Sequence, residues 1–508
     1  MPNFQFILKV LSICSLHQSN KVMSTDSGTP TEFIETIDSK AFTGFLQNLS
    51  RDKKGKDSKW ISITLPIAGI DPLAALELDD TREEKFYWDH PEENTSISAA
   101  GKITELKATG SNRFQEIADA TRLLKDQISA YTAIQHSMAG PLFLGGYSFN
   151  DHNIGRVWNR FGAARFVLPE WMLVKSGHLH LLTLVIEKGD KELHDIYQEI
   201  IERFTDFMNL AGSLQNSRRT TKQRSNIVCT LQTPDDKSRW VKKVAKAKKL
   251  IEQKKFEKIV LARRVTIESR CPLDSTVMIH NLRQKYPGCY NFLIQVDSET
   301  SFVGATPERL ASFKQGTFLT EGLAGSISRG KTATEDASLE QSLMGSKKDR
   351  SEHHFVVRAI NDNLKPFSES VDHPKIPQIK KLNNVQHLFT PISASIKSGV
   401  QIHQLIQKLH PTPAVGGFPR DEATPYIQEI EQIERGWYSA PIGWFNLNGC
   451  GEFAVAIRSA LLDNNKAYLY AGCGIVSDSD AEKEWSETLL KFRPMMDAIN
   501  QLEESYYD

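Results

Sequence analysis

A lysine inside an apolar segment is the first candidate for chemistry in this chain. Lys258 lies within residues 256–265, a β-branched and apolar run that is typical of a strand. Because side chains alternate along a strand, Lys258 shares one face with Val260 and Ala262. If that face is buried, burial lowers the pKa of the lysine and leaves an amine that can take a proton from water. A lysine that reaches from a strand edge into solvent is the commoner arrangement for such a residue taken alone.

A glutamate fifty residues further on could supply the complementary proton donor. Glu308 follows Pro307 in a predicted turn at the end of the apolar segment 302–306. A partly desolvated carboxyl group has a raised pKa and can donate a proton at neutral pH. An exposed turn glutamate is the alternative.

Further carboxylates suit a divalent cation. We expect Glu352 at the entrance of a helix, and a capping box at Ser479–Glu482 that opens another helix. Glu484, Glu487 and Lys491 are spaced i, i+3 and i+7 in that second helix, so they share one face. Mg²⁺ is usually held by one or two carboxylates together with waters and an anionic substrate. A surface row of ion pairs is the alternative interpretation.

Two other segments indicate an anionic ligand. Arg458 interrupts the apolar segment 452–460, predicted as a strand, and its planar guanidinium suits a carboxylate. The segment 320–326 ends in small residues, which allow a ligand to approach backbone N–H groups closely.

The elements that must position these residues mix strands and helices irregularly. We predict a strand over 60–66, a helix over 114–133 from the spacing of its apolar residues, and a helix that contains the buried Trp240. Without a strict alternation of strand and helix, the pattern indicates an α+β fold with large, mainly antiparallel sheets.

Composition divides the chain into three parts. Residues 1–58 are predicted to be a poorly ordered extension, with an ill-defined tail at 1–22 and a possible start at Met23. Residues 59–232 form a scaffold part that ends in a basic connector at 211–226. Residues 233–502 form the part that carries the candidate chemistry.

Charge and cysteine usage narrow the class of partner. The 508 residues have a formal net charge of zero, so no overall field favours nucleic acid or an acidic membrane. Six scattered cysteines suit free thiols in the cytoplasm, and no segment is predicted to cross a membrane. We therefore expect a cytoplasmic protein, monomeric by default, that acts on a small molecule.

Taken in order, these segments resemble the chorismate-utilising enzymes, and within them the isochorismate synthases. The similarity covers roughly residues 235–500, with a weaker echo at 140–170. It rests on the following motifs: KIVLAR from Lys258, GATPERL around Glu308, LAGS from Leu323, Glu352-His353, HPTPA from His410, Arg458, and AGCGIV from Ala471 followed by Glu487 and Lys491. The resemblance implies two large, mainly antiparallel sheets packed together and flanked by helices.

The resemblance also implies roles. Lys258 would deprotonate a water that attacks C2 of chorismate, and Glu308 would protonate the departing C4 hydroxyl. Relatives that add ammonia carry glutamine in place of Lys258, and one branch has a nucleophilic lysine in place of Ala324, so this pair points to water. Mg²⁺ would be bound by Glu352 and Glu487, with Glu484 nearby. The remaining substrate contacts implied are Gly325, Ser326, His387, Tyr438, Arg458, Gly472 and Lys491.

Two alternatives stay open. A salicylate synthase keeps the same lysine and then eliminates pyruvate from isochorismate. A non-catalytic protein that binds chorismate would keep the fold without the chemistry, although the presence of all four of Lys258, Glu308, Glu352 and Glu487 argues against it. The long amino-terminal half favours the menaquinone branch over siderophore or salicylate formation.

Overall fold

The fold is described from a computed structural model of the chain. The described residues are 39–504, except for 52–54, 56, 153, 214–229, 232–236 and 384. The predicted tail at 1–22, most of the extension to residue 58, most of the connector at 211–226 and the boundary near 232 lie outside the described residues.

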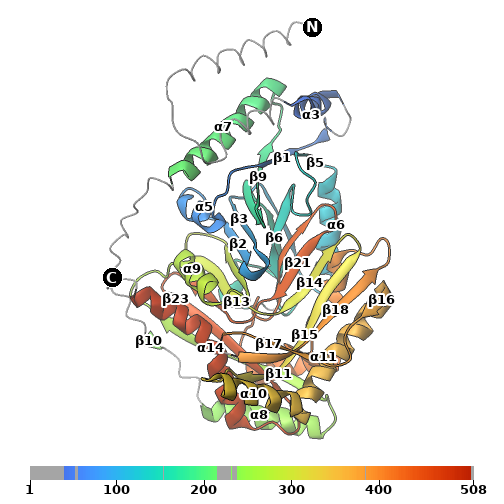
Figure 1. The fold of residues 1–508 in the computed structure, drawn as a ribbon, viewed down its shortest axis with the longest axis vertical. Coiled ribbons are helices and arrows are strands. Elements are labelled where there is room, and N and C mark those ends of the chain that lie inside the picture. Colours follow the sequence, from blue (N-terminus) through green and yellow to red (C-terminus); the bar gives the residue numbers. More distant parts are fainter. Residues whose placement is uncertain are drawn as a thin grey trace.

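Two large sheets dominate the molecule (Figure 1). In the described residues the first sheet has 13 strands, antiparallel except for the parallel pair β1 and β5. In spatial order they are β10 (Thr230–Leu231), β11 (Lys258–Glu268), β23 (Lys466–Ile475), β22 (Ser459–Asp463), β13 (Thr300–Thr306), β12 (Tyr290–Gln295), β2 (Lys85–His90), β3 (Thr95–Ala100), β8 (Trp171–Ser176), β9 (Leu179–Glu187), β1 (Trp60–Pro66) and β5 (Ile128–Thr132), with β19 (Gly417–Phe418) beside β11.

The second sheet is antiparallel throughout its described part and has 10 strands. In spatial order they are β16 (Ser368–Asp372), β18 (Val385–Ile396), β15 (Thr317–Ser328), β14 (Arg309–Lys314), β21 (Gly451–Val455), β20 (Pro441–Asn446), β6 (Leu142–Tyr147), β7 (Ala164–Leu168) and β4 (Thr104–Ala108), with β17 (Gln378–Lys381) beside β18. The predicted α+β class with two mainly antiparallel sheets is confirmed.

Helices cover the outer faces of the sheets. They are α3 (Lys40–Arg51), α5 (Pro72–Leu78), α6 (Arg113–Lys125), α7 (Leu193–Ser213), α8 (Lys237–Glu252), α9 (Ser275–Lys285), α10 (Ala333–Gly345), α11 (Lys347–Leu364), α12 (Ile402–Leu409), α13 (Arg420–Glu431) and α14 (Ala481–Glu504), with short 3₁₀ turns at Pro91–Glu93, Arg156–Trp158 and Lys365–Phe367. Helices α5, α9 and α14 pack on the first sheet, and α6, α11 and α12 pack on the second.

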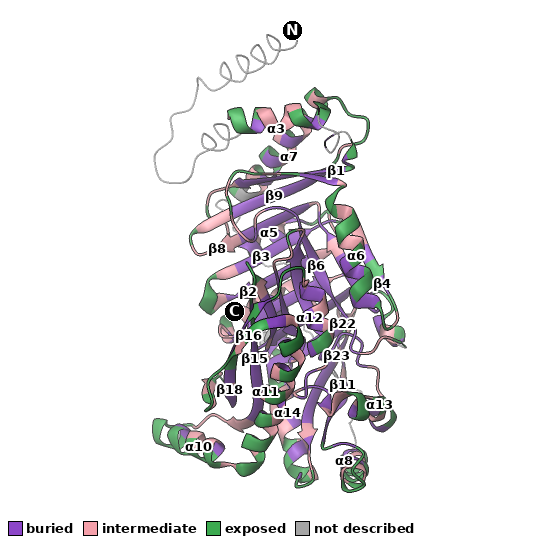
Figure 2. Cartoon of the chain, turned by 90° about the vertical axis from the view of Figure 1, so that its right-hand side faces the viewer, coloured by how far each residue is buried: buried purple, intermediate pink, exposed green. Residues whose placement is uncertain are grey.

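The larger hydrophobic core lies between the sheets. It contains Phe292 and Phe302 from the first sheet and Phe143 and Phe453 from the second, all fully buried. Figure 2 shows that the strands are largely buried, whereas α8, α10 and α13 carry exposed faces. Central strands such as β13 and β20 are buried at every position, because the side chains that alternate away from this core face the covering helices.

The two halves of the chain share both sheets. Strand β2 pairs with β12 in the first sheet, and β6 pairs with β20 in the second. The predicted scaffold part therefore continues the same sheets that carry the candidate chemistry.

Two local predictions are wrong. Residues 40–51 were expected to be poorly ordered, but they form α3, whose Phe42 is fully buried and packs edge-on against Tyr131. The predicted helix over 114–133 ends at Lys125, because Ile128 begins β5 and pairs with Trp60 of β1. Long-range strand pairing overrides the local helical spacing there.

No helix in the described part of the chain is long and apolar enough to span a membrane. Within the described residues, no disulfide joins any two of Cys271, Cys289, Cys450 and Cys473.

The link between the two halves can be tested at Gly436. Its φ of 54° is left-handed, and an added Cβ would lie 2.1 Å from the Trp158 ring. We expect Gly436→Ala to lower the free energy of unfolding by about 2–5 kcal/mol, because backbone strain and overpacking add. Gly449 is a matched control, since it also has a left-handed φ of 84° but nothing within 4 Å of the added Cβ. Equal losses of thermal stability in the two variants would contradict this account.

Candidate active site

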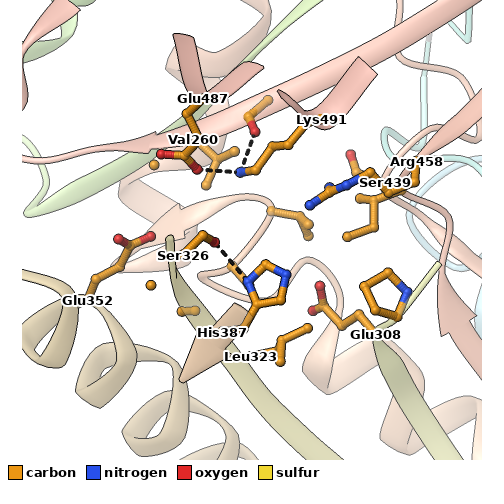
Figure 3. A pocket seen from close by; sticks show the side chains of 18 of the residues that line it. Val260, Glu308, Leu323, Ser326, Glu352, His387, Ser439, Arg458, Glu487 and Lys491 are labelled. Atoms are coloured by element: carbon orange, nitrogen blue, oxygen red, sulfur yellow. Dashed lines mark hydrogen bonds and ion pairs between the residues drawn. The ribbon is translucent and has the colours of Figure 1, made fainter. Parts of the chain in front are cut away.

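The predicted site residues converge on one cavity. It lies where β11 and β23 of the first sheet meet β15 and β18 of the second, and helices α11 and α14 close it. Every predicted site residue except Lys258 lines it: Glu308, Gly325, Ser326, Glu352, His387, Tyr438, Arg458, Gly472, Glu484, Glu487 and Lys491. In Figure 3, Glu352 and Glu487 lie toward one side of the cavity, and Glu308 and Arg458 lie toward the other.

Lys258 lies just behind the cavity wall. It is the first residue of β11 and its side chain is fully buried, as predicted. Its Nζ lies 2.9 Å from Glu352 Oε1 in an ion pair, yet the geometry leaves Nζ without a well-aligned hydrogen bond. Gly474 makes this approach possible, because an added Cβ there would be 2.6 Å from Glu352 Oε1 and 2.9 Å from Lys258 Cε.

Glu308 is buried in the turn between β13 and β14, as predicted. Burial, reinforced by the negative charge of Glu321, raises its pKa to about 8, although Arg458, Lys380 and Lys258 act in the opposite direction. The carboxyl group therefore carries its proton at neutral pH and can donate it.

Each of the three candidate metal ligands is paired with a lysine. Glu352 pairs with Lys258 as described, Glu484 lies 3.0 Å from Lys348 Nζ, and Glu487 lies 2.6 Å from Lys491 Nζ. Burial alone would raise the pKa of Glu352, but the Lys258 ammonium reverses this and the net shift is downward. The pKa of Glu484 is raised by burial and by the nearby charge of Glu487.

These residues fit a hard divalent cation only in part. Among the described residues, no three His, Cys, Asp or Glu side chains cluster closely enough to hold a metal ion. Glu352, Glu484 and Glu487 nevertheless line one cavity, and Mg²⁺ needs only one or two carboxylates when waters and an anionic ligand complete its shell. A bound cation would replace the lysines as the positive charge beside these carboxylates. The Mg²⁺ site stays a prediction.

The part of the cavity opposite the three carboxylates contains side chains that can donate hydrogen bonds. His387 Nδ1 lies 2.8 Å from Ser326 Oγ, while its buried Nε2 has no protein partner (Figure 3). Burial and the positive charges of Arg458 and Lys491 hold the pKa of His387 well below its usual range, so the ring is neutral. Within the described chain, the buried guanidinium of Arg458 makes no hydrogen bond or ion pair with another side chain, and it faces the cavity.

Gly325, Tyr438 and Gly472 shape the same wall of the cavity. Gly325 has a left-handed φ of 77° at an irregularity in β15, between the residues paired with Leu388 and His387. Tyr438 stacks on Tyr470 with ring centroids 5.0 Å apart. The Gly472 carbonyl accepts a hydrogen bond from Lys491 Nζ at 2.9 Å and so helps to hold this lysine in the wall.

Three details of the predicted site are wrong. Helix α11 begins at Lys347, capped by Ser346, so Glu352 lies in its second turn and not at its entrance. Arg458 lies in the turn between β21 and β22, with a φ of 53°, and not within a strand.

The expected capping box at Ser479–Glu482 is also wrong. Asp480 accepts the hydrogen bonds from the N–H groups of Glu482 and Lys483, whereas Ser479 accepts from Val476. Helix α14 still presents Glu484, Glu487 and Lys491 on one face.

Sequence reasoning missed several residues of the site. Lys348 and Arg435 line the cavity, and Glu321 and Lys380 lie next to the Glu308 turn. Nothing local distinguishes these charged residues from surface ones. Gly474 had a usable signal, since glycines within an apolar strand indicate a close approach of other groups.

Comparison with known proteins gives consistent results. The family model described as "Chorismate binding enzyme" matches residues 45–500. The chain is similar to isochorismate synthase MenF of Bacillus subtilis, with 34% identity over 462 residues, 89% of this chain and 96% of that protein. It is also similar to the salicylate biosynthesis isochorismate synthase of Pseudomonas aeruginosa, with 35% identity over 446 residues, 85% of this chain and 89% of that protein. Among solved structures, MenF of Escherichia coli, a menaquinone-specific isochorismate synthase, superimposes with a TM-score of 0.70 at 25% identity, covering 91% of this chain and all of that one.

The raised pKa of Glu308 has a consequence for stability. In the unfolded chain this carboxyl group ionises near its ordinary pKa, but in the folded chain it stays protonated until about pH 8. Its contribution to stability is therefore complete at acidic pH and is lost as the pH rises from about 4.5 to about 8. We expect Glu308→Gln to be more stable than the parent protein at pH 8, by up to about 4 kcal/mol, and nearly equal at pH 5.

Thermal unfolding of both proteins across this pH range measures the difference. Glu116→Gln, at an exposed position of α6, is the matched control and should change stability little at any pH. A difference between Glu308→Gln and the parent protein that does not grow with pH would contradict the burial of an acidic proton at Glu308.

Proposed function

The chain belongs to the chorismate-binding enzymes, and on that basis we propose that it is an isochorismate synthase, which converts chorismate reversibly to isochorismate. The observation that carries the proposal is the placement of Lys258 and Glu308. The buried amine of β11 and the buried, protonated carboxyl group in the turn between β13 and β14 approach one cavity, and Ala324 lines the cavity with a methyl group. No nucleophilic side chain stands at Ala324, so water is the nucleophile.

Lys258 and Glu308 divide the proton transfers. Lys258, as the neutral amine, takes a proton from water while the water oxygen bonds to C2 of the ring. The two conjugated ring double bonds shift, the C4–O bond breaks, and Glu308 gives its proton to the departing hydroxyl, which leaves as water. One water enters and one leaves, so the product is an isomer of the substrate. General acid and base groups each contribute about 10²–10⁴-fold to such a step.

Lys258 must be freed before it can act. Its Nζ lies 2.9 Å from Glu352 Oε1, so that pair has to open before Lys258 can take a proton from water. The path for the proton passes Gly474, whose missing side chain leaves the amine access to the cavity. The cavity volume of about 70 Å³ is small for a ring with two carboxylates, so the cavity has to widen when chorismate binds.

The basic residues of the cavity would hold the two carboxylates of chorismate. Arg458 is buried without a protein counter-ion in the described chain and suits bidentate binding of the enolpyruvyl carboxylate. Lys491 and Tyr438 lie in the same wall. The neutral His387, with its unpartnered Nε2, is suited to a hydrogen bond with the ring or its hydroxyl. Positioning of this kind supplies much of the rate beyond proton transfer.

Mg²⁺ is the cation that the carboxylates would hold. Glu352 and Glu487 would be its ligands, with Glu484 as a further ligand or a partner through water, because these groups share one cavity and their present partners are lysines. Bound there, Mg²⁺ would neutralise the ring carboxylate and fix its orientation.

The reaction can be tested directly. We expect the purified protein to convert chorismate to isochorismate when Mg²⁺ is present and to lose activity in excess chelator, with recovery on adding Mg²⁺. Chromatography of the products and a coupled assay for pyruvate distinguish the possible outcomes. Pyruvate released in step with salicylate would replace isochorismate synthase by salicylate synthase as the function. No conversion of chorismate at all would leave a binding protein.

The two catalytic residues make a second test. Lys258→Ala and Glu308→Ala should each lower kcat by at least about 10²-fold, because each removes one proton transfer. Circular dichroism should show that both variants stay folded. Lys246→Ala, which removes an exposed lysine of α8, is the control and should keep full activity. An active Lys258→Ala protein would overturn the assignment of the base.

A further inference from the structure

Glu321 holds the backbone beside Glu308 from outside the cavity. It lies on β15, is buried, and does not line the cavity. Its Oε1 accepts a hydrogen bond from the Arg309 N–H at 2.8 Å. The residue that follows the predicted acid is thus fixed by a buried carboxylate from a neighbouring strand.

Lys380 holds the other side of the same turn. It comes from β17, and its Nζ donates to the Pro307 carbonyl at 2.7 Å. The same Nζ lies 3.2 Å from Glu321 Oε1. Pro307, Lys380, Glu321 and Arg309 therefore form a chain of contacts that brackets Glu308 on both sides of its own peptide units.

The inner face of the turn is fixed as well. The Glu308 carbonyl accepts a hydrogen bond from Val455 N–H at 3.0 Å, and Thr306 Oγ1 donates to the Val455 carbonyl at 2.6 Å. With its backbone held from β15, β17 and β21, Glu308 keeps only its side-chain torsions free. These backbone contacts fix the position of Glu308, and its carboxyl group takes part in none of them.

Charges from several elements face Glu308. Glu321 of β15 is negative, while Lys380 of β17, Lys258 of β11 and Arg458, next to β22, are positive. Two further groups of the cavity do not change this balance: His387 of β18 is neutral, and Lys491 of α14 is paired with Glu487. Arg309, the chain neighbour, is turned toward Glu93, Tyr290 and Glu452.

We propose that Glu321 and Lys380 are a pair of positioning residues for the general acid, which hold the turn at Pro307–Arg309 and set the charge next to the Glu308 carboxyl group. The role of Glu308 as a general acid rests on the proposed function, but the contacts that hold its turn do not. Glu321 favours the protonated form of Glu308 and Lys380 the ionised form, so the two residues act in opposite directions.

Because the two residues act in opposite directions, removing each one should shift the pKa of Glu308 in the opposite direction. Glu321→Gln keeps an oxygen for the Arg309 N–H and removes the negative charge, so the pKa of Glu308 falls. The acid is active while protonated, and the alkaline limb of kcat/KM should move to lower pH by about one pH unit. Lys380→Met removes the positive charge and leaves Glu321 uncompensated, so the limb should move to higher pH by a similar amount.

Two further variants separate charge from structure. The double variant Glu321→Gln with Lys380→Met restores the net charge, and its alkaline limb should return to that of the parent protein. Lys381→Met is the matched control, because Lys381 is the next residue of β17 and pairs with Asp336 and Glu340 of α10. That variant removes the same charge one residue away and should leave the limb in place.

A readout without turnover keeps this inference separate from the proposed function. The infrared C=O stretch of protonated Glu308, obtained as a difference against Glu308→Gln, should titrate near pH 8 in the parent protein. It should move down in Glu321→Gln and up in Lys380→Met. If the protein did not convert chorismate, this titration would still decide the role of the pair.

The outcomes are distinct. Opposite displacements in the single variants, with a return in the double variant, support the proposal. Lower kcat with an unmoved alkaline limb, or displacement of both single variants in the same direction, would mean that the pair is only structural and would overturn it.

Discussion

The site depends on compensation of charges that are buried together. Lysines and carboxylates from β11, α11 and α14 meet at a cavity between two apolar sheets, where an isolated charge would be costly. Each carboxylate of the predicted metal site is satisfied by one lysine: Glu352 by Lys258, Glu484 by Lys348, and Glu487 by Lys491. In the proposed function, a cation would replace a lysine beside a carboxylate and an anionic substrate would accept the released lysine. The lysine–carboxylate pairs meanwhile limit the cost of burying these charges in the cavity.

Glu308 differs from these carboxylates because no lysine in the described part of the chain compensates its charge. Its carboxyl group has no lysine partner at hydrogen-bonding distance in the described residues, and it avoids the cost of burial by keeping its proton. The positive charges near it are either paired elsewhere, as Lys380 is with Glu321, or directed at the cavity, as Arg458 is. One cavity therefore holds Glu352, whose pKa is lowered by the adjacent Lys258, and Glu308, which stays protonated with no described lysine in contact. That difference is what an acid and a metal ligand require of the same side chain type.

Sequence reasoning succeeded where the signal was local. The apolar strand around Lys258 and the proline turn before Glu308 could be predicted because both depend on neighbouring residues, and the resemblance of several ordered motifs supplied the two-sheet fold. The prediction failed where distant segments decide the structure. The helix expected to reach Ile128 stops early because that residue pairs with Trp60 in a parallel ladder. Lys348 was missed because a lysine in the first turn of a helix has no local mark that separates a solvent-exposed residue from one facing a cavity.

The strand that carries Lys258 is held in place by side chains where strand pairing is missing. On one edge, β11 pairs with β23 from Ile259 to Glu268, but on the other it pairs only briefly with β19 and β10. The backbone groups between those short ladders are buried and need partners. Glu431 accepts from the Ala262 N–H at 2.6 Å, and Arg435 donates to the Val260 carbonyl at 3.0 Å and to the Val415 carbonyl at 2.8 Å. Glu431 and Arg435 also form an ion pair with each other, so this buried pair supplies the hydrogen bonds that a neighbouring strand would otherwise make. It also connects β11 to the loop at Val415, which lines the cavity. The Glu431–Arg435 pair therefore fixes the β11 backbone at Val260 and Ala262, and Val260 and Arg435 themselves line the cavity.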